Sequence, residues 1–256
     1  MDISIVTITF NNFDELLKTI ASTEQLGCER IVVNGGDCEK TKKFLRERSD
    51  LVSLSEHDKG ISDAFNKGIA LATKKGVWFL NSGDVCIDRE FISFADEKIP
   101  AHDFVYSPII FADPEVGEYV MEPIPERSLG LGIPFLHPGL IVSRKVFADV
   151  GNFDLSYKLA MDYELMCRMS KRGYRGIYFP GRSVLMDGTG ISKQKPFKGH
   201  IELGRALLKN HLFQIENIIC YSYRTLKLCI KYTFYFLGLG SAYELFKGTV
   251  PLKWRK

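Results

Sequence analysis

Blocks of apolar residues alternate with amphipathic stretches along the first third of the chain. The apolar, β-branched run from Ile3 to Thr9 predicts a buried first strand, and a helix opening at Asp14 follows it. Ile31 to Val33 and Leu51 to Leu54 predict two more strands, with a helix from Thr41 to Arg48 between them. This alternation predicts an α/β fold, with a mostly parallel central sheet that carries helices on both faces.

Residues 55 to 84 predict a strand-helix-strand unit. The chain turns at Gly60, continues as a helix from Ile61 to Thr73, and returns to the sheet from Val77 to Leu80. Ligands of open α/β sheets bind at the carboxyl ends of the strands. We therefore expect one crevice lined by the polar residues found where these strands end: Glu56, Asp58, Lys59, Asp63, Asn66, Asn81 and Asp84.

The pattern becomes less regular in the second half. It predicts strands at Phe104–Tyr106, Tyr119–Met121 and Leu140–Val142, with Pro114-Glu115 as a turn, and helices at Arg144–Val150 and Ala160–Lys171. Asp162 falls in the first turn of the last of these helices. The glycine-rich run from Met186 to Ser192 predicts a mobile loop, and a plain connector fits it equally well.

The tail predicts two helices, at residues 197–211 and 217–236. In the second, Arg224, Lys227 and Lys231 share one helical face, and apolar residues occupy the opposite one. The longest charge-free run, Tyr232 to Tyr243, is shorter than the roughly 20 residues that span a bilayer. The tail therefore either lies on an anionic membrane surface or packs on the preceding domain.

Composition narrows the class of protein without choosing a function. The chain has 256 residues, 45% hydrophobic and 25% charged, and a net charge of +3, which gives no reason to expect nucleic acid as a partner. Six cysteines without metal-site spacing are interpreted as buried small residues of a reducing cytosol. The start at Met1 has no signal-peptide pattern, so we expect a cytoplasmic protein.

Two nucleotide-binding motifs are missing from the first strand-to-helix turn. No G-x-G-x-x-G sequence follows Thr9, and no P-loop spacing occurs, which argues against a dinucleotide-binding domain. A nucleotidyltransferase on a similar sheet would need a glycine-rich, basic loop here, and Phe10-Asn11-Asn12-Phe13 does not supply one.

Three motifs resemble family 2 glycosyltransferases of the GT-A fold, especially the bacterial colanic-acid, O-antigen and capsule enzymes. The motifs are Ser55-Glu56-x-Asp58-Lys59-Gly60-Ile61-x-Asp63-Ala64-x-Asn66-Lys67-Gly68, Leu80-Asn81-Ser82-Gly83-Asp84, and Gly151-x-Phe153-Asp154 followed by Asp162-Tyr163-Glu164-Leu165. The resemblance covers residues 1 to about 195. It implies a GT-A domain made of a nucleotide-sugar-binding half (1–100) and an acceptor-binding half (101–196), with a helical extension (197–256).

The resemblance also implies residue roles. Asp84 becomes the ligand of Mg²⁺ or Mn²⁺, which stabilises a leaving diphosphate, and Asp162 becomes the general base that deprotonates the acceptor hydroxyl. His137 and Glu164 are assigned to the acceptor side. The expected contacts of the nucleotide sugar are Thr9, Phe10, Asn11, Asn34, Asp58, Lys59, Asp63, Asn66, Asn81 and Ser82.

Several of these residues also have a purely structural interpretation. Asp84 and Asp162 are common residue types at helix starts, Asn34 fits a plain turn, and His137 fits a packing role. Arg144 either pairs with a phosphate or braces Asp154. Each alternative stays open at the level of sequence.

The expected function is an inverting transfer of a hexose. The donor is a nucleotide sugar, expected to be UDP-linked. The acceptor is a bacterial surface polysaccharide, such as lipopolysaccharide O-antigen, or its lipid-linked precursor. The sequence departs from the family pattern at Gly83, where an acid is usual, and at Asn34, where an Asp is usual. The alternative is therefore a sugar-nucleotide-binding protein with weak or no transferase activity.

Overall fold

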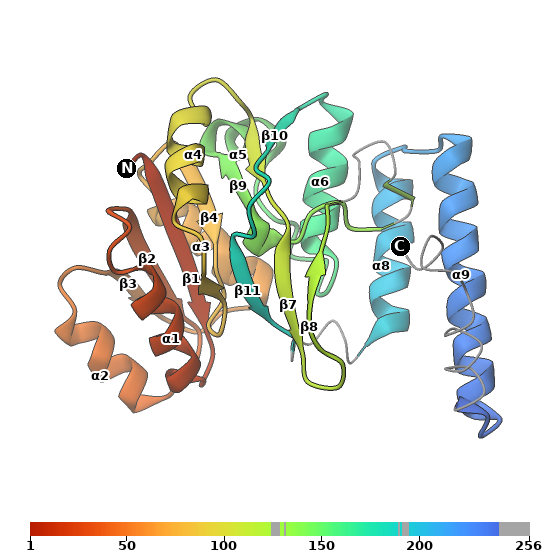
Figure 1. Ribbon diagram of the computed structural model, residues 1–256, viewed down its shortest axis with the longest axis horizontal. Coiled ribbons are helices and arrows are strands. Elements are labelled where there is room, and N and C mark those ends of the chain that lie inside the picture. The colour runs from red at the N-terminus through yellow and green to blue at the C-terminus, as the bar shows by residue number, and fades with distance from the viewer. Residues whose placement is uncertain (124–128, 131, 189, 191–194, 241–256) are drawn as a thin grey trace.

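A seven-stranded sheet forms the centre of the molecule (Figure 1). The computed structural model describes residues 1–123, 129–130, 132–188, 190 and 195–240. The strand order is β10-β6-β9-β4-β1-β2-β3. The strands are β1 (Ile3–Thr9), β2 (Glu29–Asn34), β3 (Val52–Ser55), β4 (Gly76–Phe79), β6 (Phe104–Tyr106), β9 (Leu140–Ser143) and β10 (Gly176–Tyr178).

This sheet is mostly parallel, as the sequence predicts. β1 pairs in parallel with both β2 and β4, and β2 pairs in parallel with β3. β9 is antiparallel to its neighbours β4 and β6. The register aligns Thr9 with Asn34 and Asn34 with Ser55, so three consecutive strands end at one edge of the sheet.

A second, smaller sheet lies beside this edge and was not predicted. Its order is β5-β11-β7-β8, formed by β5 (Val85–Cys86), β11 (Val184–Asp187), β7 (Ile109–Asp113) and β8 (Gly117–Met121). The prediction missed β7 and was wrong in placing Met186 and Asp187 in a loop. These strands are short and gain their regularity from pairing with distant segments, as Leu185 does with Ile110 and Val85. The rest of the predicted loop includes residues outside the described ranges.

Helices cover both faces of the central sheet (Figure 1). All predicted helices are present, and α4 is an addition to the prediction. The bounds are α1 (Phe13–Thr23), α2 (Glu39–Glu47), α3 (Ile61–Leu71), α4 (Glu90–Lys98), α5 (Arg144–Val150), α6 (Met161–Lys171), α8 (Pro196–Lys209) and α9 (Ile215–Phe236). α8 lies against α6, and α9 is the outermost element on that side of the molecule.

The largest hydrophobic cluster joins the central sheet to α3, α5, α6 and α8. It contains Val6 from β1, Phe104 from β6 and Met161 from α6, together with Leu203 and Leu207 from α8. The first C-terminal helix is therefore part of the main core. None of the described helices has the length and hydropathy needed to cross a bilayer.

The cysteines differ in part from the expectation of burial. None of the six forms a disulfide. Only Cys167 is buried, four others are partly exposed, and Cys229 is exposed. The prediction of burial was wrong for these five.

Candidate active site

Asp84 lies in the turn between β4 and β5, at the carboxyl edge of the central sheet. Its carboxylate accepts hydrogen bonds from the backbone N–H of Asn81 (2.9 Å) and of Asp187 (3.3 Å). The residue is only 2% exposed. Burial, together with the nearby Asp187 carboxylate, raises the pKa of Asp84 from 3.8 to about 7.

Asp162 lies in the first turn of α6, across the site from Asp84. Its Oδ1 accepts a hydrogen bond from the backbone N–H of Tyr163 at 2.8 Å, and the residue is buried. Burial raises the pKa of Asp162 from 3.8 to about 6. Two buried carboxylates with raised pKa values thus come from segments 78 positions apart.

His137 and Asn81 connect these two acids. Nδ1 of His137 lies 4.0 Å from Oδ2 of Asp162, and Nε2 of His137 lies 3.0 Å from Nδ2 of Asn81. The backbone N–H of Asn81 in turn donates to Asp84. Asp84, Asn81, His137 and Asp162 therefore form one continuous row. Two of them, Asn81 and Asp84, come from the crevice expected from the sequence, and His137 and Asp162 join them from the second half of the chain.

The row determines the protonation of His137. The amide nitrogen of Asn81 can only donate, so Nε2 of His137 accepts and the ring proton lies on Nδ1, facing Asp162. Burial lowers the pKa of His137 to about 4, so the imidazole is neutral at neutral pH. A neutral ring with this tautomer is a hydrogen-bond donor directed toward Asp162.

Unpartnered polar atoms accumulate in the turn that precedes Asp84. Oδ1 of Asn81 and Oγ of Ser82 are buried and have no hydrogen-bond partner. Asp84 forms no ion pair with any residue in the described ranges. A buried polar group without a partner costs about 1–3 kcal/mol. Two such groups in one turn, beside a buried carboxylate without an ion-pair partner in the described ranges, indicate that a polar ligand completes this site.

The turn offers oxygen donors but no complete metal cage. Within the described ranges, no group of three or more His, Cys, Asp or Glu residues is arranged to hold a metal ion. The Asp84 carboxylate, with Asp187 nearby, suits a hard cation that takes its other ligands from water and phosphate. The residues present therefore fit a weakly held divalent ion.

The backbone explains the departure at Gly83. Its φ is +106°, a conformation that side chains rarely adopt, and a Cβ added here would lie 3.3 Å from the Asp187 side chain. An acid at this position would be strained and would face a like charge. Glycine is therefore the residue that this turn requires.

The residues after β1 form the wall of a groove. Oγ1 of Thr9 donates to Oδ1 of Asn12 at 2.7 Å, and Phe10 is 62% exposed. Asn11 has a φ of +56°, and its Oδ1 accepts from the backbone N–H of Cys38 at 3.0 Å. A cavity of about 480 Å³ lies between this turn and the start of α2. Phe10 offers an exposed ring, whereas the polar groups of Thr9 and Asn11 hold the turn.

Asn34 and Asp58 brace the ends of β2 and β3. Asn34 is fully buried, and its amide both accepts from the N–H of Gly36 and donates to the Gly36 carbonyl, each at 3.1 Å. The structure thus favours the plain-turn alternative for Asn34. Asp58 accepts from the N–H of Gly60 at 2.8 Å, and its other oxygen packs against Gly35.

Asp63 and Asn66 are engaged within α3 and its neighbour. Asp63 accepts from the backbone N–H of Lys59 at 2.9 Å, which closes the first turn of the helix. The side chain of Asn66 exchanges two hydrogen bonds of 2.9 Å with the backbone of Phe153. These residues link the two halves of the fold, and the Lys59 side chain remains exposed.

Glu164 does not belong to the row. Its fully buried carboxylate is paired with Arg168 at 2.9 Å and with Lys209 at 3.2 Å. These ion pairs engage the Glu164 carboxylate away from the row, and its assignment to the acceptor side stays a prediction. Two positions after Asp162, the side chain points away from the row to Lys209 of α8, and Arg168 and Lys209 balance its charge.

Glu202 on α8 was missed by the sequence analysis. Its Oε2 accepts hydrogen bonds from the backbone N–H of Lys158 (3.1 Å), Leu159 (2.8 Å) and Ala160 (3.0 Å). These three residues lead directly into α6, which carries Asp162. No motif in the sequence marks Glu202, because its role depends on α8 packing beside this segment.

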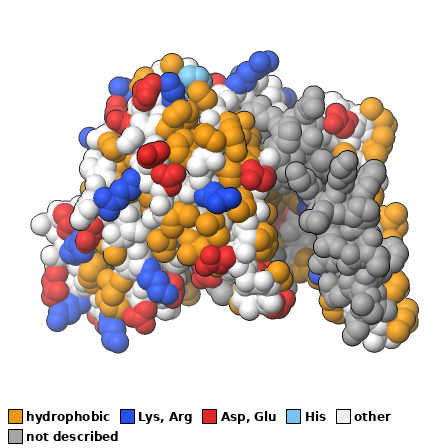
Figure 2. Space-filling model, in the orientation of Figure 1, with side chains coloured by type: hydrophobic (Ala, Val, Ile, Leu, Met, Phe, Trp, Pro, Cys, Tyr) orange, Lys and Arg blue, Asp and Glu red, His pale blue; other side chains and the backbone are white. Residues whose placement is uncertain are grey.

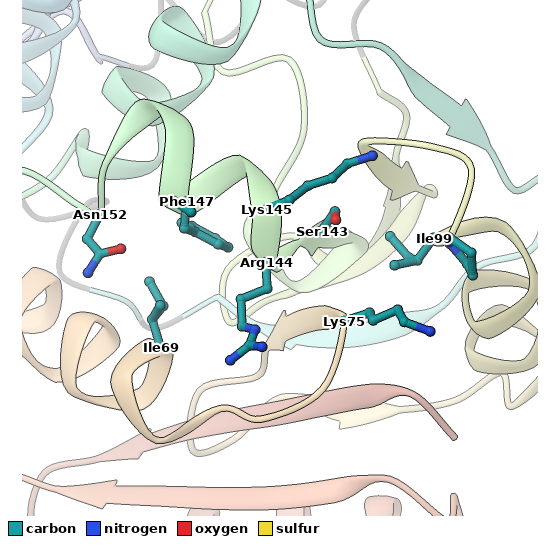
Figure 3. A pocket seen from close by; sticks show the side chains of 10 residues that line it. Ile69, Lys75, Ile99, Ser143, Arg144, Lys145, Phe147 and Asn152 are labelled. Carbon is teal, nitrogen blue, oxygen red and sulfur yellow. The ribbon is translucent and has the colours of Figure 1, made fainter.

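Arg144 lies at the opposite edge of the sheet. Its Nη1 donates to the carbonyl of Ala72 at 3.0 Å, and Asp154 pairs instead with Lys209. Arg144 lines a cavity of about 530 Å³ with Lys75 and Ser143 (Figure 3). Since Gly76 pairs with Ser143, this cavity lies at the start of β4 and not at Asp84. The prediction that Arg144 braces Asp154 was therefore wrong. Arg144 also cannot reach a phosphate bound at the carboxyl edge of the sheet.

Comparison with known proteins gives a consistent family. A model described as glycosyl transferase family 2 matches residues 4–151. An uncharacterised glycosyltransferase of Mycobacterium tuberculosis is 30% identical over 177 residues, which are 65% of this chain and 68% of that protein. A PGL/p-HBAD biosynthesis glycosyltransferase of Mycobacterium bovis is 25% identical over 64% of this chain and 68% of its own length.

Solved structures share the fold. TarS of S. aureus (residues 1–349) has a TM-score of 0.63 at 16% identity, with 81% of this chain and 66% of that chain covered. The mannosyltransferase PcManGT of Pyrobaculum calidifontis has a TM-score of 0.62 at 15% identity, with 95% and 80% covered. These matches confirm the GT-A type of fold that the sequence motifs imply.

Proposed function

Because the chain belongs to glycosyltransferase family 2, we propose that it is an inverting enzyme that moves a hexose from a nucleotide sugar to an acceptor hydroxyl. The donor is UDP-linked. The acceptor is a bacterial surface polysaccharide or a lipid-linked oligosaccharide precursor of one, of the kind from which lipopolysaccharide O-antigen is built.

One observation carries this proposal. Asp84 and Asp162 are both buried, both have raised pKa values, and both contact the same row through Asn81 and His137. Perturbed carboxylates that share a site are typical of catalytic centres. Sugar transfer needs two such acids, one near the leaving group and one near the nucleophile.

Asp84, Asn81 and Ser82 serve the donor in this proposal. A divalent ion, Mg²⁺ or Mn²⁺, would be held by Asp84 and would stabilise the negative charge of the departing diphosphate. The unpartnered Oδ1 of Asn81 and Oγ of Ser82 are available to orient the sugar or a phosphate. The raised pKa of Asp84 is consistent with a carboxylate that waits for a cationic partner.

Asp162 serves the acceptor. Ionised above pH 6, it accepts the proton of the incoming hydroxyl as that oxygen attacks the anomeric carbon from the face opposite the nucleotide. The glycosidic bond to the nucleotide breaks and the configuration inverts. The neutral His137 directs Nδ1 toward Asp162 at 4.0 Å, so it places a polar N–H near the carboxylate without adding a charge.

Solved complexes of proteins with this fold support the choice of a nucleotide sugar as donor. TarS has been solved in complex with UDP and with UDP-GlcNAc, and PcManGT with GDP-Man and Mn²⁺. These complexes support a nucleotide sugar as donor and a divalent cation as cofactor. The UDP preference and the hexose are part of our proposal.

The name of one relative bears on the acceptor. The related PGL/p-HBAD glycosyltransferase is named for a biosynthetic pathway, which supports a biosynthetic role. We propose that the enzyme works on the cytoplasmic face of the inner membrane, where a lipid-linked acceptor would be presented.

The test is donor hydrolysis across a panel of UDP and GDP sugars, with Mn²⁺ or with EDTA. We expect nucleotide release that depends on the metal and favours one UDP-hexose. Equal turnover in EDTA would remove Asp84 from its role. Tight nucleotide binding without transfer to any saccharide acceptor would favour the alternative, a sugar-nucleotide-binding protein.

A further inference from the structure

The outward side of α9 carries apolar side chains along the length of the helix. Ile215, Ile219, Leu226 and Ile230 follow each other at helical spacing and are 71%, 60%, 59% and 39% exposed. We call these four residues the outer face of α9. The edge of α9 that faces away from the rest of the molecule is largely orange in Figure 2.

The inward side of α9 makes polar and aromatic contacts. The side chain of Asn217 is buried and accepts from the N–H of Gly130 at 2.9 Å. The ring of Tyr221 stacks on His200 of α8 with centroids 4.4 Å apart, and the hydroxyl of Thr225 lies 2.8 Å from the His200 imidazole. A surface helix of a globular protein normally turns its apolar side inward. In α9 the four aliphatic residues of the outer face lie on the exposed side instead.

These inward contacts determine which way α9 faces. They use polar groups at residues 217, 221 and 225, which repeat at four-residue spacing on one side of the helix. The apolar residues must therefore face outward. Exposed apolar stretches of this extent mark a surface that binds something. The 22 residues of α9 extend over about 33 Å, which is long enough for a substantial contact.

Charge identifies the partner. Residues 195–256 contain eleven Lys or Arg and three Asp or Glu, a net charge of +8. Since the whole chain carries +3, the first 194 residues carry −5. Two copies that met through this segment would bring +8 against +8. An anionic surface would be attracted to it instead.

The side chains beside the outer face fit a lipid surface. Tyr223 is 49% exposed next to it, and an aromatic ring with a polar tip is favoured at the boundary between lipid and water. Lys227 is exposed at its border. A helix with this composition binds in the plane of a membrane without crossing it.

We propose that the outer face of α9 docks on an anionic lipid bilayer and lies in its headgroup layer. α8 then lies between the membrane and the row that contains Asp162, because α8 packs on both α6 and α9. The use of this contact to reach a lipid-linked acceptor rests on the proposed function, but the binding itself does not.

The experiment uses the full chain and point substitutions. Removing everything from Phe197 onward would also remove Glu202 and the core residue Leu203, so loss of binding after truncation would have two explanations. The variant is the triple substitution I219E/L226E/I230E. The matched control is V116E, at an exposed valine in the turn between β7 and β8.

Flotation with two kinds of vesicle gives the readout. We expect the wild type and V116E to bind vesicles that contain phosphatidylglycerol, to bind phosphatidylcholine vesicles weakly, and to lose binding at high salt. The triple variant should bind roughly tenfold less or weaker still. Metal-dependent hydrolysis of a soluble nucleotide sugar should be equal in all three proteins, which reports an intact fold and tests the proposed function separately.

Three results would overturn the docking surface. The triple variant could float as well as the wild type, or the wild type could fail to bind either kind of vesicle. In the third, the wild type is a dimer in solution and the triple variant is a monomer, because the outer face would then be covered by a second copy.

Discussion

Nδ1 of His137 lies 4.0 Å from Oδ2 of Asp162, and burial shifts the pKa values of the two groups in opposite directions. The imidazole stays neutral while the carboxylate ionises near pH 6. The pair therefore does not behave as an ion pair at neutral pH. It is a carboxylate that can accept a proton, with a neutral imidazole 4.0 Å away.

Replacing Asp162 by Asn should abolish sugar transfer and leave nucleotide binding intact. The amide has nearly the same shape but cannot accept the proton of the acceptor hydroxyl. Transfer is measured with a saccharide acceptor, and binding is measured by calorimetric titration with UDP. Asp154→Asn is the matched control, since Asp154 pairs with Lys209 outside the row. Transfer within a few-fold of the wild type in Asp162→Asn would place the base elsewhere.

The raised pKa of Asp162 links activity to pH. At saturating Mn²⁺, which keeps Asp84 ionised, kcat should fall about tenfold per pH unit below about pH 6, because only the ionised Asp162 accepts a proton. A profile of kcat from pH 4.5 to 8 tests this. A flat profile across pH 6 would contradict the assignment.

The raised pKa of Asp162 also affects stability. The ionised form that activity requires is the form that stabilises the folded protein less. The pKa of Asp162 is raised above its usual value of 3.8, so the folded protein binds this proton more tightly than the unfolded chain. The resulting stabilisation is complete below about pH 4 and is lost as pH rises through about 6. Asp162→Asn should therefore raise the free energy of unfolding at pH 8, by up to about 3 kcal/mol. Urea unfolding at pH 8 and at pH 4 measures it, and a gain that is equal at both would be inconsistent with burial as the cause.

Glu202 should matter for kcat although it lies outside the row. Its carboxylate holds three consecutive N–H groups of the segment that leads into α6. Glu202→Ala frees this segment, and we expect kcat to fall about tenfold or more, since small displacements of a catalytic group are costly. KM for the donor should change little. Glu202→Gln keeps an acceptor oxygen and should recover part of the rate.

The control for Glu202 is Glu216→Ala, which removes an exposed acid from the neighbouring helix α9. If Glu202→Ala and Glu202→Gln have the same kcat as each other and the same lowered melting temperature, the carboxylate supports only the fold.

Gly83→Asp restores the family pattern, but we expect it to lower the free energy of unfolding. The φ of +106° is unfavourable for any side chain, and the new carboxylate would face Asp187. We expect a loss of about 1–3 kcal/mol in the free energy of unfolding. Gly83→Ala carries the backbone strain without the charge, so calorimetry on the pair separates the two effects. Mn²⁺ titration should show no tighter binding in Gly83→Asp; tighter binding would mean that the turn can adapt.

The features that the sequence could predict depend on interactions between residues close together along the chain. The apolar run at Ile3–Thr9, the turn at Gly60 and the first-turn position of Asp162 follow from periodicity and backbone preference, which act between near neighbours. The same patterns placed Asp84 at the end of a strand, and the family resemblance supplied its role. The sequence could also show that the tail is amphipathic and basic.

Only the tertiary structure decided how these pieces meet. Asn34 and Asn66 were expected at the donor, but their amides are used by Gly36 and Phe153, and only the folded chain brings these groups within bonding distance. Lys209, which pairs with Glu164, and the three N–H groups that Glu202 accepts from lie more than 40 residues away from these acids along the chain. The direction in which α9 faces depends on His200 and Gly130, because a helical pattern shows which side is apolar but not which side is covered.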